Sequence, residues 1–347
     1  MEVLLPDEIG MGFRKNITFV VKFKGATSFL LFFSRMTKIS NFLYRDYSSF
    51  LAEHFDGKVQ KLSVDGGFNC PNRDGTVGRG GCTYCNNLSF VPPYCHPGDS
   101  IRTQLELGKC FFGKKYPDMK YLAYFQSHTN TYAPLDRLRR LYEEALSVSD
   151  VLGLVISTRP DCLPDSLLDY LGELAQNYHV VVELGVESVD DRQLRQLNRG
   201  HTFQQAALAV NRLAEKGIFT AVHLILGLPG DTPQSLLTQP AILSALPIHI
   251  LKLHQLQIVK QTPMAEQFRR EPSAFGALFQ SPEDYVSLLV DYLPRLRSDI
   301  VLERFTAQCP EDLLIAPRWG MKNHELVALL KKEMRRRGVF QGQLYAP

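Results

Sequence analysis

Residues 70–85 read CPNRDGTVGRGGCTYC, and they carry three cysteines, Cys70, Cys82 and Cys85, on one glycine-rich loop. The loop follows a short strand-like run over residues 59–64. A Cys-x-x-Cys pair lets two thiolates converge on one metal centre, and glycines let the backbone fold closely around it. Three cysteines also leave one coordination position for another group. The spacing therefore predicts a metal centre directly after this strand.

The residues of this loop alone leave three interpretations open. Thiols without a metal are the least favoured, because cysteines are usually buried among apolar residues and this loop is rich in Gly, Asn, Arg and Asp. In a zinc site, Cys95 or His96 would complete a tetrahedral ligand set. In an iron–sulfur site, the three cysteines would hold a cluster with one open iron. Tyr84, an aromatic residue directly before the last cysteine, favours the cluster when it is combined with the motifs that follow.

The composition is that of a globular protein from a reducing compartment. Of 347 residues, 45% are hydrophobic and 22% are charged, and a chain of this length can bury the core of one α/β-barrel domain. The net charge of +3 neither requires nor excludes a nucleic-acid partner. Seven cysteines in such a chain indicate thiols that serve metals or chemistry rather than disulfides, so we expect a cytoplasmic protein.

The first 35 residues differ from the rest of the chain. Residues 17–34 are apolar and aromatic, but Lys22 and Lys24 interrupt them. The uncharged run that remains, residues 25–34, is far shorter than the roughly 20 residues that span a bilayer. We therefore expect no membrane anchor, and we interpret residues 1–35 as a non-native or disordered extension upstream of a biological start at Met36. The alternative is an ordered arm or a segment that lies weakly on a membrane surface.

Apolar runs alternate with helical patterns at the spacing of strand–helix units. The expected strands cover residues 59–64, 121–125, 151–157, 180–186, 221–226 and 248–258. The expected helices cover residues 100–112, 134–146, 164–176, 202–216 and 232–245. This alternation implies a parallel sheet covered by helices. We predict an α/β fold with a partial (β/α)6 TIM-type barrel over residues 36–260, a Cys loop over residues 66–90, and a C-terminal α/β extension over residues 261–347.

Polar motif residues and a glycine lie at or just past the carboxyl ends of the expected strands, where the active sites of barrels lie. These residues are Gln126, Asn130, Ser157, Arg159, Glu187 and Gly227, whereas Glu183 and His223 lie within expected strands. Arg159 suits a carboxylate ligand because a guanidinium offers paired donors, and an ion pair with Asp161 is the alternative. Glu183 and Glu187 share one face of a strand, which either lines the barrel mouth or is solvated. His223 is either a site residue or a hydrogen-bonded core histidine.

The order of these motifs resembles that of radical S-adenosylmethionine (SAM) enzymes, specifically the bacterial YhcC/YtqA (MnmL) group, which is akin to the Elongator catalytic subunit. The resemblance covers roughly residues 44–343. The motifs that carry it are Asp65–Gly75, Gly80–Cys85, Tyr124–Gln126, Thr129–Pro134, Thr158–Cys162, Glu183–Ser188, Asn198–His201 and His223–Gly230.

The resemblance implies a [4Fe–4S] cluster on Cys70, Cys82 and Cys85, with SAM bound at the open iron. One electron from the cluster would cleave the C5′–S bond of SAM, and the 5′-deoxyadenosyl radical would take hydrogen from a substrate. An electron donor such as flavodoxin or ferredoxin is implied as a partner. Gln126 would take the SAM amino group, and Gly227 would let backbone approach the adenine closely. The cosubstrate contacts implied in full are Tyr84, Gln126, Asn130, Ser157, Arg159, Glu183, Glu187, His223 and Gly227.

The relatives also imply a tRNA substrate, with remodelling of the C5 side chain of the wobble uridine. The expected reaction removes the carboxymethyl group of carboxymethylaminomethyluridine and leaves aminomethyluridine. Two other functions stay open. One is a radical SAM enzyme on a small molecule such as a tetrapyrrole precursor, which a basic surface around the barrel mouth would argue against. The other is a zinc-stabilised, non-catalytic RNA-binding protein, which needs Cys95 or His96 as a fourth ligand.

The C-terminal segment has two features that bear on the substrate. The helix expected over residues 323–337 ends in basic residues that either contact RNA phosphates or are solvated. Residues 306–309 read TAQC where the family has a Thr-Gly-Asp run, so the resemblance implies no substrate role for that corner. The segment is too short for an Elongator-like acetyltransferase domain, and acetyl transfer is not expected.

Overall fold

A computed structural model describes residues 42–86, 92–96, 98–113, 116, 118–307 and 309–346. The predictions for residues 1–35 lie outside the described residues. Within the described part, no helix has both the length and the apolar character needed to cross a bilayer.

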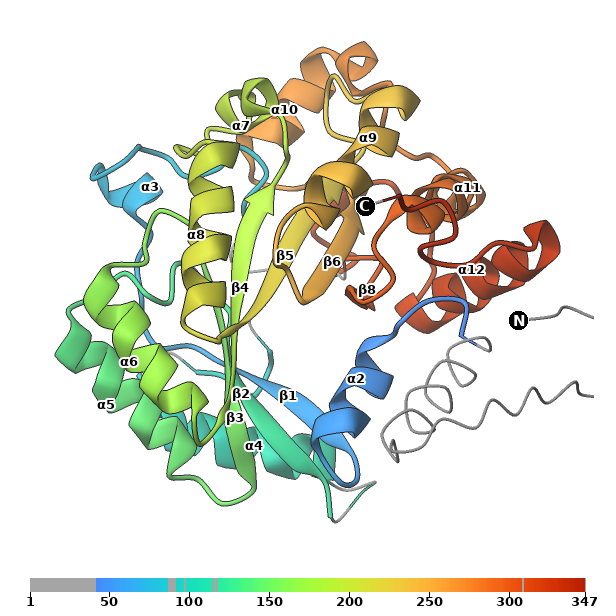
Figure 1. The fold of residues 1–347 in the computed structure, drawn as a ribbon. Coiled ribbons are helices and arrows are strands. Elements are labelled where there is room, and N and C mark those ends of the chain that lie inside the picture. Colours follow the sequence, from blue (N-terminus) through green and yellow to red (C-terminus); the bar gives the residue numbers. More distant parts are fainter. Residues whose placement is uncertain are drawn as a thin grey trace, which may run out of the picture. The chain divides into compact units, whose positions relative to one another are not determined.

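Seven parallel strands form one sheet, and each strand pairs with the next in the order β1-β2-β3-β4-β5-β6-β8 (Figure 1). The predicted partial barrel is confirmed, and β8 extends it with a strand from the C-terminal segment. The expected strand over residues 248–258 divides in two, because β7 leaves the sheet and pairs antiparallel with β9. The strands are β1 (Val59–Val64), β2 (Lys120–Phe125), β3 (Val151–Thr158), β4 (His179–Glu187), β5 (Phe219–Leu226), β6 (Ile250–Gln255), β7 (Ile258–Val259), β8 (Val301–Arg304) and β9 (Leu314–Ala316).

Helices connect successive strands and cover the outer face of the sheet (Figure 1). Thr202 and Thr232 each cap a helix with a reciprocal capping box. The helices between strands are α4 (Ile101–Gly113), α5 (Leu135–Leu146), α6 (Asp165–Ala175), α8 (Phe203–Glu215) and α9 (Pro233–Ser244). Shorter or later helices are α2 (Tyr47–His54), α3 (Pro71–Asp74), α7 (Asp191–Gln196), α10 (Pro263–Arg270), α11 (Pro282–Tyr292) and α12 (Asn323–Arg337).

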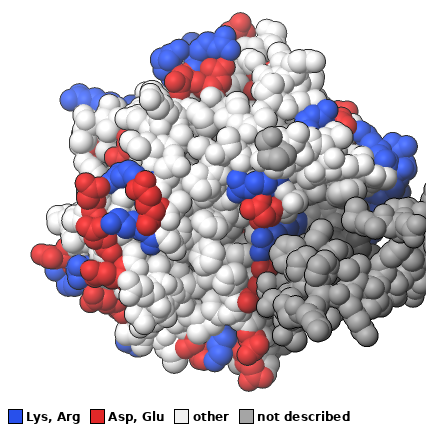
Figure 2. Space-filling model, in the orientation of Figure 1, with Lys and Arg blue, Asp and Glu red and all other residues white. Residues whose placement is uncertain are grey.

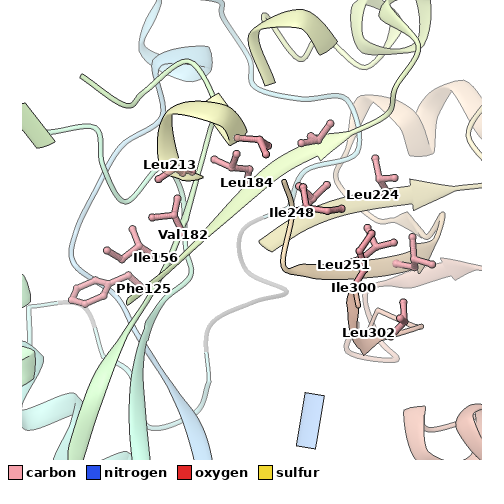
Figure 3. Packing of buried hydrophobic residues seen from close by; sticks show 14 of the residues in the cluster. Phe125, Ile156, Val182, Leu184, Leu213, Leu224, Ile248, Leu251, Ile300 and Leu302 are labelled. Atoms are coloured by element: carbon pink, nitrogen blue, oxygen red, sulfur yellow. The ribbon is translucent and has the colours of Figure 1, made fainter. Parts of the chain in front are cut away.

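The main core lies between the sheet and these helices. Side chains alternate across a strand, so one set from each strand faces outward to this layer. Figure 3 shows members of the set from β2 to β8, among them Phe125, Val182 and Leu251, and Leu213 of α8 lies next to Val182. All four are fully buried. This layer stabilises the barrel and leaves the inward-facing side chains to form the interior.

The interior is closed at the amino ends of the strands by helix α2. Phe50 of α2 is only 3% exposed, and it packs with inward-facing residues of the strands, including Val155, Val181 and Ile250. We call this apolar end the floor of the barrel. The edge strands β1 and β8 are bridged by an ion pair of 2.7 Å between Lys61 Nζ and Glu303 Oε2. The floor and this bridge leave the carboxyl ends of the strands as the open end, which we call the mouth.

Candidate active site

A cavity of about 170 Å³, open to solvent on one side, lies at the mouth. The predicted site residues that line it are Cys70, Cys82, Tyr84, Cys85, Gln126, Ser157, Arg159, Glu183, Glu187 and His223. The structure therefore brings residues from the Cys loop and from strands β2 to β5 into one site.

Asn130 and Gly227 are not among the lining residues. The Asn130 side chain donates to the carbonyl of Ser157 at 2.8 Å and its backbone carbonyl accepts from Tyr142, so it fastens the loop after β2. Gly227 has a positive φ of 85°, and a Cβ there would lie 2.8 Å from the carbonyl oxygen of Ala277. The hydrogen bonds of Asn130 and the backbone conformation of Gly227 therefore give both residues a structural role.

The Cys loop is held by chain segments far from it in sequence. The amide of Thr83 donates to the carbonyl of Leu197 at 3.0 Å, and the amide of Met264 donates to the carbonyl of Thr83 at 2.9 Å. The side chain of Asn198 donates to the carbonyl of Gly81 at 2.8 Å. The loop is therefore fixed between the ends of α7 and α10 rather than by its own sequence.

Nitrogen donors surround the sulfur atoms of the loop. Arg199 Nη1 lies 3.3 Å and Asn72 Nδ2 lies 3.5 Å from Cys82 Sγ, and Arg73 Nη2 lies 3.6 Å from Cys85 Sγ. Burial and the neighbouring Cys82 raise the pKa of Cys85, whereas Arg73 and Arg199 act in the opposite direction. Cationic and N–H donors at this distance favour sulfur in its anionic form.

The fourth zinc ligand that the alternative requires is not found in the described part of the chain. Cys95 is 5% exposed, donates to the carbonyl of Ser63 and does not line the cavity; burial raises the pKa of its thiol to about 12. His96 does not line the cavity either. Among the described residues, no group of three or more His, Cys, Asp or Glu side chains is close enough to hold one metal ion.

Glu183 is the centre of a buried polar network. Its Oε1 accepts from Lys252 Nζ at 2.6 Å, from Tyr124 at 2.8 Å and from Ser157 at 2.9 Å. Burial alone would raise the pKa of Glu183, but Lys252 and Lys61 outweigh it and hold the pKa well below its usual value. The other oxygen, Oε2, is buried and has no hydrogen-bond partner among the described residues. Glu183 is thus ionised and keeps one acceptor free.

Glu187 begins a second chain of polar contacts. Strand β4 is irregular between Gly185 and Glu187, and Glu187 has a positive φ of 69°. Such strain in a non-glycine residue is typical of functional sites. Glu187 Oε2 lies 2.7 Å from His223 Nδ1, and its Oε1 lies 3.5 Å from Arg199. Burial would raise the pKa of Glu187, but His223 and Arg199 lower it to about 2.

Arg159 forms the ion pair that the sequence offered as an alternative. Its Nε and Nη2 donate to the two carboxylate oxygens of Asp161 at 2.9 and 2.8 Å. The side chain is 2% exposed, and Nη1 is buried without a hydrogen-bond partner among the described residues. The guanidinium therefore keeps one donor in addition to the structural pair.

Several polar residues that line the cavity were not among the predicted site residues. Lys252 and His254 of β6, Arg304 of β8 and His128 lie outside every motif quoted from the sequence, whereas Arg73, Tyr124 and Arg199 lie within motifs but were given no role. Lys252 and His254 interrupt an apolar run at positions two apart, which is the spacing of one strand face. That spacing was the available signal. The corner at residues 306–309, where the family motif is absent, lies just beyond Arg304; Gln308 is outside the described residues.

Two family models match this chain, the Radical SAM superfamily over residues 70–238 and the Radical_SAM C-terminal domain over residues 248–336. YtqA of Bacillus subtilis is 38% identical over 303 residues, which are 87% of this chain and 92% of YtqA. The level of identity and the coverage of both chains are sufficient to show common family membership.

Two more distant likenesses concern larger proteins. The tRNA uridine(34) acetyltransferase of Methanocaldococcus infernus is 22% identical over 217 residues, and this chain spans 38% of that protein. The solved structure of the archaeal Methanocaldococcus infernus Elp3 superposes with a TM-score of 0.61 at 15% identity, over 83% of this chain and 65% of Elp3. The second likeness shows a shared fold. From the family models and from YtqA, the chain belongs to the radical SAM superfamily and, within it, to the family of YtqA.

Proposed function

We propose that this radical SAM enzyme holds its cluster on Cys70, Cys82 and Cys85 and binds SAM in the cavity at the mouth. SAM and a [4Fe–4S] cluster are the cofactors of the superfamily, and together they supply hydrogen abstraction from an unactivated carbon. The donor set fits a cluster better than one metal ion, because each cysteine binds a different iron and the sulfurs need not converge. Arg73, Arg199 and Asn72 around the sulfurs support the assignment.

Unpaired buried atoms support the proposal for SAM. The α-amino acid part of SAM needs acceptors for an ammonium group and a donor for a carboxylate, and ribose hydroxyls need further acceptors. Glu183 Oε2 is a free acceptor and Arg159 Nη1 a free donor among the described residues, and both residues line the cavity. Gln126, just after β2, also lines the cavity and would take the amino group.

We propose tRNA as the substrate and the C5 side chain of the wobble uridine as its reacting part, with carboxymethylaminomethyluridine converted to aminomethyluridine. Sequence similarity to an enzyme named for uridine 34 of tRNA supports this. The surface gives less support. On the face shown in Figure 2, groups of Lys and Arg lie beside groups of Asp and Glu, and neither sign forms a continuous field.

Helix α12, the other expected RNA contact, is largely occupied by its own protein. Arg336 and Arg337 pair with Glu333, and Lys331 lies over the ring of Tyr44. Among the described residues, Lys332 and Arg335 have no ion pair. The substrate proposal therefore depends on family relationship, whereas the cofactor proposal depends on the geometry of the cavity.

The observation that carries the proposed function is the Cys loop, fixed at the mouth with donors on its sulfur atoms and free polar atoms across the cavity. The test is anaerobic reconstitution with iron and sulfide, a visible spectrum, and an assay for 5′-deoxyadenosine after addition of dithionite. We expect a brown protein that forms deoxyadenosine, and then the loss of carboxymethylaminomethyluridine from added tRNA. A reducing protein such as flavodoxin or ferredoxin in the cytoplasm would replace dithionite.

Other outcomes of this experiment identify the alternatives. A colourless protein with one tightly bound zinc and no deoxyadenosine would replace the proposal with a non-catalytic RNA-binding protein. Deoxyadenosine without any change in the nucleosides of tRNA would leave the cofactor chemistry standing and move the substrate to a small molecule such as a tetrapyrrole precursor.

A further inference from the structure

A second group of polar residues lines the cavity where strands β6 and β8 end. It consists of Lys252 and His254 of β6 and Arg304 of β8, and we call it the β6–β8 group. The register between the two strands shifts here, since Leu251 pairs with Leu302 but Lys252 pairs with Arg304. Glu303 is thus the extra residue of a β-bulge. Bulges redirect side chains near active sites, and this one directs two consecutive charged residues inward.

Arg304 differs from the other cations of the cavity in its partners. Lys252 pairs with Glu183, Arg159 with Asp161, and Arg199 with Glu187, while Arg73 donates to a cysteine sulfur. For Arg304, the hydrogen-bond partner found in the described part of the chain is a nitrogen of His254, at 3.0 Å. No carboxylate of the described residues lies within ion-pair distance of its guanidinium, and its Nε is buried without a partner.

The neighbours of Arg304 do not supply the missing negative charge. Burial, followed by His223, Arg304 and Lys252, holds the pKa of His254 well below its usual value, so His254 is neutral. Glu303 faces Lys61 at 2.7 Å. The single lone pair on His254 Nε2 is also approached by His223 Nε2, at 2.8 Å, so Arg304 competes for it. A partly buried guanidinium with a free Nε and a contested acceptor is poised to bind an anion.

We propose that Arg304 binds the free carboxylate of the substrate side chain, and that it selects carboxymethylaminomethyluridine over uridines that lack the carboxylate. This inference rests on the proposed function, since a carboxylate is the feature that separates that nucleoside from its product. A planar carboxylate matches the paired donors of a guanidinium, which an ammonium group would not reproduce. After the carboxymethyl group has left, Arg304 loses its anion and the product is bound less tightly.

The test measures binding without turnover. The full chain, loaded with cluster and SAM but without a reductant, is titrated with two preparations of one tRNA that carry either carboxymethylaminomethyluridine or aminomethyluridine. We expect the wild-type protein to bind the first about ten- to a hundred-fold more tightly, as for one charge-assisted contact. In Arg304→Gln the ratio should fall to about one, and in Arg304→Lys it should be intermediate.

Three controls accompany the titration. Arg335→Gln on α12 removes one exposed positive charge elsewhere, so its ratio should equal that of wild type. Thermal unfolding of each variant shows whether it is folded. Equilibrium binding of SAM to Arg304→Gln shows whether the guanidinium holds the carboxylate of the cosubstrate instead.

The outcomes separate this inference from the proposed function. If wild type discriminates and Arg304→Gln keeps the ratio, the inference is overturned and the proposed substrate stands. A wild-type protein that binds both tRNAs equally would overturn the inference, while the proposed substrate is judged separately by the loss of carboxymethylaminomethyluridine from tRNA. An equal loss for both tRNAs in Arg304→Gln would assign the residue to a backbone phosphate, and weakened SAM binding with an unchanged ratio would assign it to the cosubstrate; either result overturns the inference.

Discussion

The floor and the mouth of the barrel interior are built from the same strands, but the floor is apolar and the mouth is polar and charged. Val181 of β4, Ala221 of β5 and Ile250 of β6 pack against α2 at the floor. Two positions further along the same strands are Glu183, His223 and Lys252. Because side chains alternate, two positions is the shortest step along one face, about 6.6 Å.

The floor is a main source of the stability of this fold, whereas the mouth lowers that stability. The floor buries apolar and aromatic side chains, which is the main source of folding free energy. The mouth buries charges and leaves several polar atoms without partners in the described residues. Unpaired buried polar groups are costly, and an active site that will bind polar ligands tolerates them. The predictions below test this division, from the largest expected effect to the smallest.

At the mouth, Cys82→Ala should abolish cleavage of SAM while the barrel stays folded. The substitution removes one of three proposed iron ligands and the sulfur to which Arg199 donates. Deoxyadenosine formation after dithionite and the far-ultraviolet circular dichroism spectrum measure the two parts of this prediction. Cys110→Ala is the matched control, because Cys110 is exposed on α4 and does not line the cavity. Retained cleavage in Cys82→Ala would remove the cluster assignment.

Lys252→Met should destabilise the protein by about 3–5 kcal/mol, because it removes one partner of a buried ion pair and leaves Glu183 without its closest cation. Urea unfolding at pH 7 measures the loss. The double variant Lys252→Met with Glu183→Gln should recover part of it, since no full charge is then left unpaired. A loss below about 1 kcal/mol in the single variant would mean that the network does not act as a charge pair.

At the floor, the neutral, buried His179 makes stability fall in mild acid. Burial, together with His54 and Lys61, lowers its pKa from 6.5 to about 4. The unfolded chain therefore binds a proton at this histidine more readily than the folded protein does. The free energy of unfolding is not reduced by this effect above pH 6.5, and it falls as the pH falls toward 4. Between pH 7 and pH 5 the loss amounts to about 2 kcal/mol.

His179→Phe should remove this part of the pH dependence, since Phe suits a site in contact with Phe50 and Phe219. The measurement is urea unfolding of both proteins at pH 7 and pH 5, with the loss in wild type larger by about 2 kcal/mol. Equal losses would show that the histidine takes up its proton in the folded protein as easily as in the unfolded chain.

Deletion of residues 1–35 should change neither the activity at the mouth nor the stability of the barrel. The sequence places these residues before the family-like region, and the proposed site residues all lie after them. Deoxyadenosine formation and the midpoint of thermal unfolding should equal those of the full chain. An inactive or unstable truncated protein would refute the interpretation of Met36 as the start.

The sequence was most informative where the chain needs unusual residues, and least where it uses ordinary ones inside regular structure. The cysteines, Arg159 and Glu187 stand out because no apolar core requires them. The alternation of strands and helices predicted the sheet, because each of these elements can be recognised from a short stretch of sequence. Lys252 and His254 were overlooked because three leucine or isoleucine residues of β6 surround them and the run resembles a buried strand.

Arg304 was not predictable for a different reason. Its inward direction depends on a bulge, and a bulge is a property of the pairing between β6 and β8 rather than of either strand alone. The ion pair of Arg159 with Asp161 is a different case, because the two residues are only two positions apart and the sequence offered both partners. The sequence could not decide between a ligand-binding role and a structural role for Arg159. Pairing between distant segments decided only the direction of Arg304.

The hydrogen bonds of Leu197 and Met264 with the Cys loop have a consequence for the order in which the chain folds. The loop itself leaves the ribosome early, but its anchors follow more than 110 and 170 residues later. Contacts over such separations form late, because the chain between them must first be ordered. We therefore expect the cysteines to reach their final arrangement only after synthesis of most of the chain, and the proposed cluster to be inserted late in maturation, on a barrel that is already nearly complete.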